Sequence, residues 1–371
     1  MALIWFTAPL LLFTHLAAAN PPECGDVKHG MKKVTPESLA YNETGDKKET
    51  LIAAKTPMSS TAPKKASRVQ SINSAADQIG DERKLDIYVP EGVDPKKKLK
   101  TVFLIHGGCF QIGGRNWDDT MDQVKRLTEA GYAVVNVDYR LTKKDPNHPG
   151  KYLDTYPTSL QDVQDAWCYM QKNGHKYNLD TSNVVAMGFS AGGTLADYLG
   201  THHHKGEDPS HKASCEPNPA GVIDMYGRTD FLSQTENHPG KPMDCGEGYA
   251  GQARKKGKNG KVQKIFHSMD LDSNIDVAKA SPHLVIVGDN DHSVGPRNSY
   301  EYCKLLGDKC TLAKIEGFDH GFSRDSERDW DKIYGKMCDW LDEKVFKDPQ
   351  LARARPVTRD DDNKPAISPD N

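Results

Sequence analysis

Residues 184–193 read Val-Val-Ala-Met-Gly-Phe-Ser-Ala-Gly-Gly, an apolar run that leads directly into a glycine-rich turn. The six residues that follow, 194–199, are Thr-Leu-Ala-Asp-Tyr-Leu and are typical of a helix. The spacing Gly-x-Ser-x-Gly therefore stands between a strand and a helix, with Ser190 at its centre. A strand that turns so sharply pushes the central side chain out of the sheet, and the positions two residues to either side have no room for a Cβ atom. The stretch predicts an exposed, nucleophilic Ser190 at the edge of a sheet.

Short apolar runs and helical patterns alternate through the rest of the chain. The other apolar runs are Lys84–Val89, Thr101–Ile105, Ala133–Val137, Val222–Tyr226, Leu284–Val287 and Thr311–Ile315. Apolar residues recur at three- and four-residue steps around 121–127, 163–170 and 330–346, which is the spacing of amphipathic helices. Alternating strands and helices predict an α/β fold, a mostly parallel sheet with helices on both faces. Sites in such folds lie at the carboxyl ends of the strands.

The apolar run Thr101–Ile105 is followed by His106-Gly107-Gly108-Cys109-Phe110. Acyl transfer passes through a tetrahedral intermediate with a negative oxygen, which needs N–H donors already in place. A glycine-rich loop after this strand supplies such donors, together with the N–H of the residue after the nucleophile. We expect the backbone N–H groups of Gly108, Cys109 and Ala191 to form this oxyanion hole, and His106 to be structural.

Two later loops also follow strands. Residues 288–294 read Gly-Asp-Asn-Asp-His-Ser-Val, and residues 316–322 read Glu-Gly-Phe-Asp-His-Gly-Phe. Because the carboxyl ends of parallel strands share one edge of a sheet, both loops are expected to open beside Ser190.

These loops supply the remaining members of a catalytic triad, in the chain order nucleophile, acid, base. His320 is the expected base, which takes the proton of Ser190, and Asp291 is expected to orient its ring. Asp289 is an alternative for the acid and His292 a more distant alternative for the base.

Together the motifs resemble the esterase/lipase branch of the α/β-hydrolase fold, the hormone-sensitive-lipase-like and feruloyl-esterase-like enzymes. The resemblance covers roughly residues 80–346 and includes Asp-Tyr-Arg-Leu at 138–141. In that family the acid lies three residues before a valine, which favours Asp291, three residues before Val294, over Asp289. Cys109 stands where the family often has a third glycine, so a side chain is expected to enter the acyl pocket there.

The resemblance implies a carboxylic ester hydrolase that works through an acyl-enzyme and uses no metal or other cofactor. Its substrate would be a small-molecule or glycan-linked ester. One alternative keeps the machinery but changes the bond, as in an amidase such as an arylformamidase, or a serine peptidase. A further alternative is a non-catalytic ligand-binding protein on a hydrolase fold. The ester substrate and the oligomeric state are left open by the sequence.

The two ends of the 371-residue chain differ from its middle. Residues 1–19 combine an apolar run with a small-residue site and predict a signal peptide cleaved near Ala19, hence secretion without a stable membrane anchor; an uncleaved anchor is the alternative. A polar flexible leader is expected over 20–78, with a glycosylation sequon at Asn42, followed by the hydrolase domain over 79–347 and a disordered tail over 348–371. With 49 basic against 52 acidic residues, the charge gives no reason to expect a nucleic-acid partner.

Eight cysteines, an even number, suit an oxidising compartment. Cys303 and Cys310 are close enough to pair across a helix-to-strand turn, whereas Cys168, inside an amphipathic helix, is expected to be a buried free thiol. The polar stretches 202–219 and 251–264 are expected to be surface loops, and no metal site is expected at the histidine triplet 202–204 because no further ligand stands at a suitable spacing.

Overall fold

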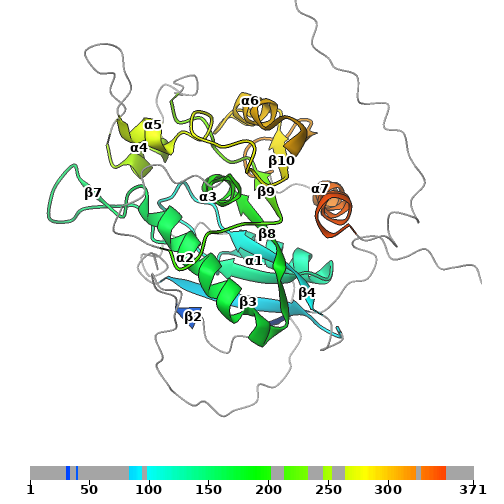
Figure 1. Cartoon of the computed structure of the whole chain (residues 1–371). Coiled ribbons are helices and arrows are strands. Elements are labelled where there is room, and N and C mark those ends of the chain that lie inside the picture. The colour runs from blue at the N-terminus through cyan, green and yellow to red at the C-terminus, as the bar shows by residue number, and fades with distance from the viewer. Residues whose placement is uncertain are drawn as a thin grey trace, which may run out of the picture.

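The computed structural model describes residues 31–33, 39–40, 83–93, 98–201, 213–232, 245–252, 264–322 and 327–347 (Figure 1). The expected signal peptide, the Asn42 sequon, the histidine triplet and the tail over 348–371 lie outside these residues, as do most of the leader and most of the loop expected over 251–264.

One nine-stranded sheet runs through the molecule. Its strands in spatial order are β1 (Met31–Lys33), β3 (Lys84–Pro90), β5 (Ala133–Val137), β4 (Leu99–Ile105), β8 (Leu179–Phe189), β9 (Gly221–Met225), β10 (His283–Gly288) and β11 (Cys310–Ile315), with β2 (Leu39–Ala40) also paired to β3. From β5 to β11 every neighbouring pair is parallel, and only β1, β2 and β5 run antiparallel to β3. The predicted mostly parallel sheet is therefore confirmed, and all seven apolar runs lie in it. A separate pair, β6 (Lys143–Lys144) and β7 (Tyr152–Leu153), forms a small second sheet.

Strands β1 and β2 correct one expectation. They fall within the segment 20–78, which the composition predicts to be a flexible leader, yet they add to β3. Two or three residues are too few to show a strand periodicity, while the edge of β3 offers unpaired backbone groups to any nearby segment.

Helices cover both faces of the sheet, as the sequence predicts (Figure 1). They are α1 (Asp118–Glu129), α2 (Thr158–Asn173), α3 (Ala191–Gly200), α4 (Cys245–Ala250), α5 (Lys264–Met269), α6 (Pro296–Leu306) and α7 (Glu327–Trp340), with short 3₁₀ turns at Gly174–Tyr177 and Gly307–Lys309 and a π-helical turn at Leu341–Phe346. Apolar residues of α2 to α6 form one core cluster, and those of α1 and α7 form a second. Within β4, Phe103 belongs to the first cluster and Leu104 to the second, so neighbouring residues face opposite layers. Of the helices described, none combines the length and the apolar character needed to cross a membrane.

Three disulfides join described residues: Cys109–Cys245, Cys168–Cys215 and Cys303–Cys310. The pairing expected between Cys303 and Cys310 is present, from α6 to β11. The free thiol expected at Cys168 is wrong, because its Cα lies 5.5 Å from that of Cys215 in the segment before β9. The apolar pattern of α2 correctly indicates that Cys168 is buried, but burial does not reveal which segment covers it.

Candidate active site

Ser190 lies in the turn between β8 and α3. Its φ of 52° and ψ of −118° are strained for a residue with a side chain, a conformation that costs about 1–3 kcal/mol and concentrates at functional sites. The neighbouring glycines make the turn possible. A Cβ atom at Gly188 would lie 2.0 Å from the carbonyl oxygen of Gly192, and one at Gly192 would lie 2.3 Å from that of Ile105. The elbow geometry inferred from the sequence is thus present, and it holds the Ser190 hydroxyl above the sheet edge.

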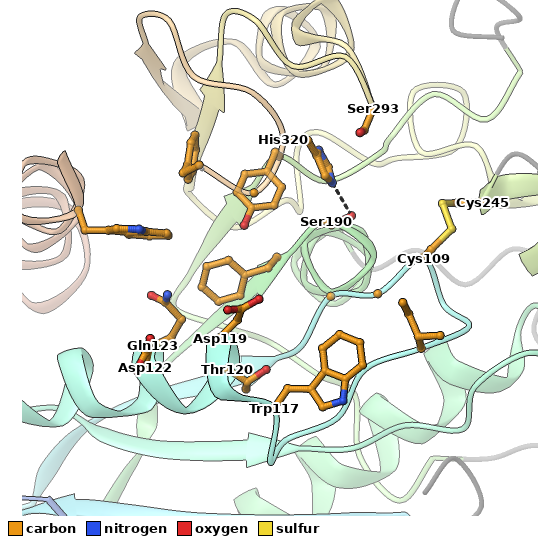
Figure 2. A pocket seen from close by; sticks show the side chains of 18 of the residues that line it. Cys109, Trp117, Asp119, Thr120, Asp122, Gln123, Ser190, Cys245, Ser293 and His320 are labelled. Atoms are coloured by element: carbon orange, nitrogen blue, oxygen red, sulfur yellow. Dashed lines mark hydrogen bonds between the residues drawn. A yellow bond between two sulfur atoms is a disulfide. The ribbon is translucent and has the colours of Figure 1, made fainter. Parts of the chain in front are cut away.

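Three side chains from three strand ends form a hydrogen-bonded relay. His320, in the loop after β11, places Nε2 2.9 Å from Ser190 Oγ (Figure 2). Its Nδ1 lies 2.8 Å from Oδ2 of Asp291, in the loop after β10. Because an ionised carboxylate only accepts, Nδ1 must carry the proton and donate it, which leaves Nε2 free to accept the proton of the serine hydroxyl.

Asp291 is fixed by its own loop. Its Oδ1 accepts hydrogen bonds from the backbone N–H groups of Ser293 (2.8 Å) and Val294 (2.9 Å), and its side chain has no exposed surface. Burial raises the pKa of Asp291, but the hydrogen bond and charge of His320 and these two N–H donors outweigh it and lower the pKa below its ordinary value. Asp291 therefore stays ionised beside the ring that it orients.

The two alternative residues point elsewhere. Asp289 accepts a hydrogen bond from the N–H of Gly317 (2.7 Å) and pairs with Lys314 at 3.3 Å. His292 is exposed and lies 3.4 Å from Asp319. The structure brings Asp291, and neither alternative, to His320 and Ser190.

The glycine-rich loop after β4, residues 106–110, is termed the donor loop and lies directly beside Ser190. A Cβ atom at Gly107 would lie 3.5 Å from Cβ of Ser190, and one at Gly108 would overlap the carbonyl of Ile112 at 1.9 Å. Within the part of the chain that the structure describes, the N–H groups of Gly108, Cys109 and Ala191 donate no hydrogen bond. All three expected oxyanion donors are therefore available next to Ser190.

His106 lies beneath this loop and not in the site. It is buried, and its ring stacks on that of Tyr139 with the centroids 4.3 Å apart. Burial lowers the pKa of His106, more strongly than the nearby Asp138 raises it. The Tyr139 hydroxyl donates to the His106 carbonyl at 3.0 Å, so the two residues brace the base of the loop.

A pocket of about 540 Å³ opens over Ser190 and His320. Its other lining residues come from the donor loop, α1, α4, the strand ends and α7: Gly107, Gly108, Cys109, Ile112, Trp117, Asp119, Thr120, Asp122, Gln123, Arg126, Phe189, Tyr226, Cys245, Ser293, Gly321, Phe322 and Trp330 (Figure 2).

Among the lining residues that the sequence did not single out, two contact residues of the predicted site. Tyr226 follows β9 and places its ring edge-on to that of His320, 4.7 Å between centroids; its position after a strand could have revealed it. Cys245 carries no such signal, because only the folded chain brings it to Cys109.

Comparison with known proteins decides the family. The BD-FAE family matches residues 85–306, more than half of the chain. The chain belongs to the BD-FAE family. Members are esterase-like α/β-hydrolases, as the sequence motifs predict.

Curated relatives of this BD-FAE chain cover it in part. A protein of Acanthamoeba polyphaga mimivirus that is named as an α/β-hydrolase is 25% identical over 228 residues, 61% of this chain and 62% of the viral protein. Esterase LipI of Mycobacterium tuberculosis is 33% identical over 112 residues, which are 30% of this chain and 31% of LipI. A non-reducing polyketide synthase of Stereocaulon alpinum is 28% identical over 171 residues, and the chain spans only 6% of its length.

Solved structures agree on the fold of the BD-FAE chain. A truncated carbohydrate esterase from gut microbiota has a TM-score of 0.54 at 22% identity, covering 70% of this chain and 90% of that protein. Esterase 2 of Thermogutta terrifontis has a TM-score of 0.55 at 19% identity, covering 71% of this chain and 88% of its own. At these identities the likeness shows a shared α/β-hydrolase fold.

Proposed function

We propose that this chain hydrolyses carboxylic esters through a covalent acyl-enzyme at Ser190. One observation carries the proposal: a relay of 2.9 Å and 2.8 Å contacts links Ser190, His320 and Asp291 beside three N–H groups that have no acceptor among the described residues. A serine in a strained turn at one ring nitrogen and an ionised carboxylate at the other are the arrangement of an activated nucleophile, and a histidine with a structural role alone does not require it.

In the proposed reaction Ser190 Oγ attacks the ester carbonyl carbon while His320 Nε2 takes its proton. The carbonyl oxygen becomes an oxyanion and accepts hydrogen bonds from the N–H groups of Gly108, Cys109 and Ala191, each of which is worth about 3 kcal/mol in comparable sites. Nε2 then returns the proton to the departing alkoxide, and the acyl group stays on Ser190. A water molecule, deprotonated by the same nitrogen, attacks this acyl ester and releases the acid.

The pocket suits a small ester with a ring or chain on either side. Its lining includes two apolar side chains with large exposed surfaces, Ile112 (51% exposed) and Trp117 (39% exposed), together with the polar side chains of Asp119 and Gln123. We therefore place small-molecule esters and esters carried on a glycan among the substrates, in keeping with the carbohydrate esterase and the esterase among the structural relatives.

Turnover of a p-nitrophenyl ester series, compared with the matching p-nitroanilides, tests this function. We expect the native chain to cleave the esters, to prefer them over the anilides, and to lose turnover when Ser190 is replaced (Ser190→Ala) while keeping its circular dichroism spectrum. Anilides cleaved faster than esters would favour an amidase or peptidase instead. Unchanged ester turnover in Ser190→Ala would remove Ser190 from the reaction.

We also propose that the protein is exported. The disulfides that join described cysteines support this, because such bonds persist in oxidising compartments. Expression of the whole chain in a secreting host should give an extracellular product that begins near Asn20, which N-terminal sequencing checks.

A further inference from the structure

The donor loop beside Ser190 has an unusual backbone. Three consecutive residues have positive φ: Gly108 at 117°, Cys109 at 59° and Phe110 at 58°. Glycine adopts such angles freely, but for a residue with a Cβ atom the left-handed region costs roughly 1–2 kcal/mol. Two adjacent non-glycine residues in this region persist only where the surrounding structure holds them there.

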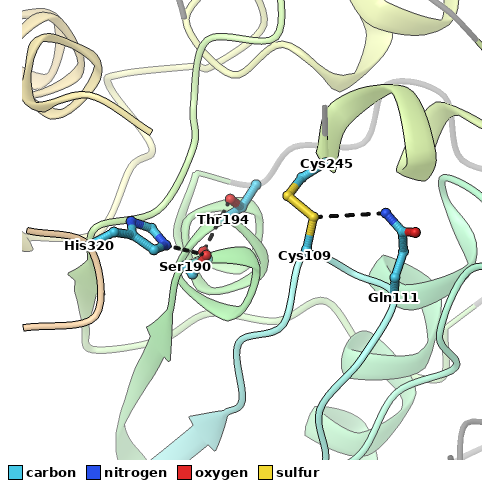
Figure 3. The surroundings of a disulfide bond; sticks show 6 residues. All are labelled: Cys109, Gln111, Ser190, Thr194, Cys245 and His320. Atoms are coloured by element: carbon cyan, nitrogen blue, oxygen red, sulfur yellow. Dashed lines mark hydrogen bonds between the residues drawn. A yellow bond between two sulfur atoms is a disulfide. The ribbon is translucent and has the colours of Figure 1, made fainter. Parts of the chain in front are cut away.

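Helix α4 contacts both of these residues. Cys245 forms the disulfide with Cys109 (Figure 3). Tyr249 stacks on Phe110, with the ring centroids 3.9 Å apart and the planes 5° from parallel. Cys245 and Tyr249 are four residues apart and so lie on one face of α4, one turn from each other. One turn of α4 thus holds two consecutive residues of the donor loop, Cys109 by a covalent bond and Phe110 by ring stacking.

Tyr249 of α4 is in turn held by contacts with other elements of the protein. Tyr249 is completely buried, and its hydroxyl accepts a hydrogen bond from Ser159 Oγ of α2 at 2.7 Å. The backbone carbonyl of Tyr249 accepts a hydrogen bond from the N–H of Tyr156 at 2.8 Å, and the Tyr156 ring packs edge-on against the Tyr249 ring. Contacts with α2 and with the segment before it therefore also hold α4 in place next to the site.

The disulfide restricts the direction of one backbone N–H group, that of Cys109. The φ angle of Cys109 is the rotation about its N–Cα bond, so it sets the torsion between the N–H and the Cβ of the same residue. Because the disulfide ties this Cβ to α4, it restricts changes in φ and with them the direction of that N–H. We propose that the Cys109–Cys245 disulfide is a positioning element of the oxyanion hole, which replaces the conformational freedom of a glycine by a covalent tether.

This inference rests on the proposed function, and a pair of variants that differ by one methyl group tests it. Cys109→Ala/Cys245→Ala removes the tether and leaves a Cβ atom at position 109, whereas Cys109→Gly/Cys245→Ala removes the tether and the conformational penalty together. Cys303→Ala/Cys310→Ala removes a disulfide between α6 and β11, away from the pocket, and is the matched control. Turnover is measured per active site, counted with a fluorophosphonate.

We expect the alanine double variant to have a kcat about 5- to 30-fold below that of the glycine double variant, which is the penalty of the left-handed region expressed as a rate. KM should differ less than about twofold between them, and the control should keep the native kcat. If the alanine variant does not fold, Cys245→Ser, which leaves Cys109 untethered, takes its place with the same expectation.

Equal kcat values for the alanine and glycine double variants would overturn the inference, whether both values match that of the native chain or both lie below it. The conformation at position 109 would then not be what the Cys109–Cys245 disulfide maintains. That result leaves the proposed function intact as long as the native chain shows Ser190-dependent ester turnover. Absence of that turnover would overturn the proposed function and this inference with it.

Discussion

At the scale of single residues, the candidate site depends on how each polar atom is held. Oδ1 of Asp291 is occupied by two backbone N–H donors, so only Oδ2 is left for His320. The ring of His320 is therefore restricted to one tautomer, the one that leaves Nε2 able to take a proton from Ser190.

Asp291→Asn should lower kcat about 10⁴-fold with little change in stability. The asparagine oxygen will occupy the place of Oδ1, where the two N–H groups need an acceptor, which turns the NH₂ group toward His320 and forces the wrong tautomer. Asp289→Asn, two residues away on the same loop, is the control and should change kcat less than about threefold. A pH-controlled ester assay decides, and the reverse ranking of the two variants would make Asp289 the acid.

Much of the site could be predicted at this scale because each group follows an apolar strand. Ser190, His320, Asp291 and the donor loop all obey that rule, and the structure brings them together. Cys245 could not be found in this way, because it lies 136 residues from Cys109 in the chain and only the packing of α4 joins them.

At the scale of elements, the long strands and helices could be read from the sequence and the short ones could not. The apolar runs locate β3 to β5 and β8 to β11, and periodicity locates α1, α2 and α7. Some elements are shorter than the window in which a sequence period is visible. These are the strands of two or three residues, β1, β2, β6 and β7, and the six-residue helices α4 and α5. Among these short elements, α4 borders the pocket.

Gly192→Ala tests how tightly the elbow joins strand to helix, and Gly335→Ala in another helix is its control. In Gly192→Ala the new Cβ atom would lie 2.3 Å from the carbonyl oxygen of Ile105 and 2.4 Å from that of His106, both backbone atoms, so we expect a loss of about 3 kcal/mol in the free energy of unfolding. Gly335→Ala in α7 meets no described atom within 4 Å and should gain about 0.5–1 kcal/mol through helix propensity. Urea denaturation measures both, and a Gly192→Ala variant as stable as the native chain would contradict the close packing of this turn.

At the scale of the whole molecule, the sheet brings residues from four strand ends together at one edge. A second cluster of polar side chains, His283, Tyr302 and Asp197, is buried inside the protein. His283, at the start of β10, is completely buried; its Nδ1 donates to the carbonyl of Ser281 at 2.7 Å, and its Nε2 lies 3.3 Å from the Tyr302 hydroxyl and 3.6 Å from Asp197. Burial lowers the pKa of His283 to about 4 and raises that of Asp197. Sequence reasoning found the sheet but not this cluster, since its members are isolated polar residues within apolar elements.

The depressed pKa of His283 predicts a loss of stability in acid. In the unfolded chain the ring titrates near pH 6.5, so as the pH falls from there toward 4 the unfolded state binds a proton that the folded state refuses. Between pH 7 and pH 4.5 the native free energy of unfolding should fall by about 2–3 kcal/mol more than that of His283→Asn, which keeps a donor for Ser281 but cannot titrate. Asp197 is present in both proteins, so the difference between their stability curves reports His283. Equal changes in the two proteins, measured by urea titrations at the two pH values, would show that the pKa of His283 is not lowered in the folded protein.

The nucleophilic role of Ser190 is the claim on which the mechanism rests. Treatment of the native chain with a fluorophosphonate, followed by peptide mapping, tests it most directly, because only a serine activated by its neighbours attacks phosphorus at a useful rate. We predict one stoichiometric adduct, on the peptide that contains Ser190, with parallel loss of ester turnover and no adduct in Ser190→Ala. An adduct on any other residue, or full inactivation with Ser190 unlabelled, would contradict the account.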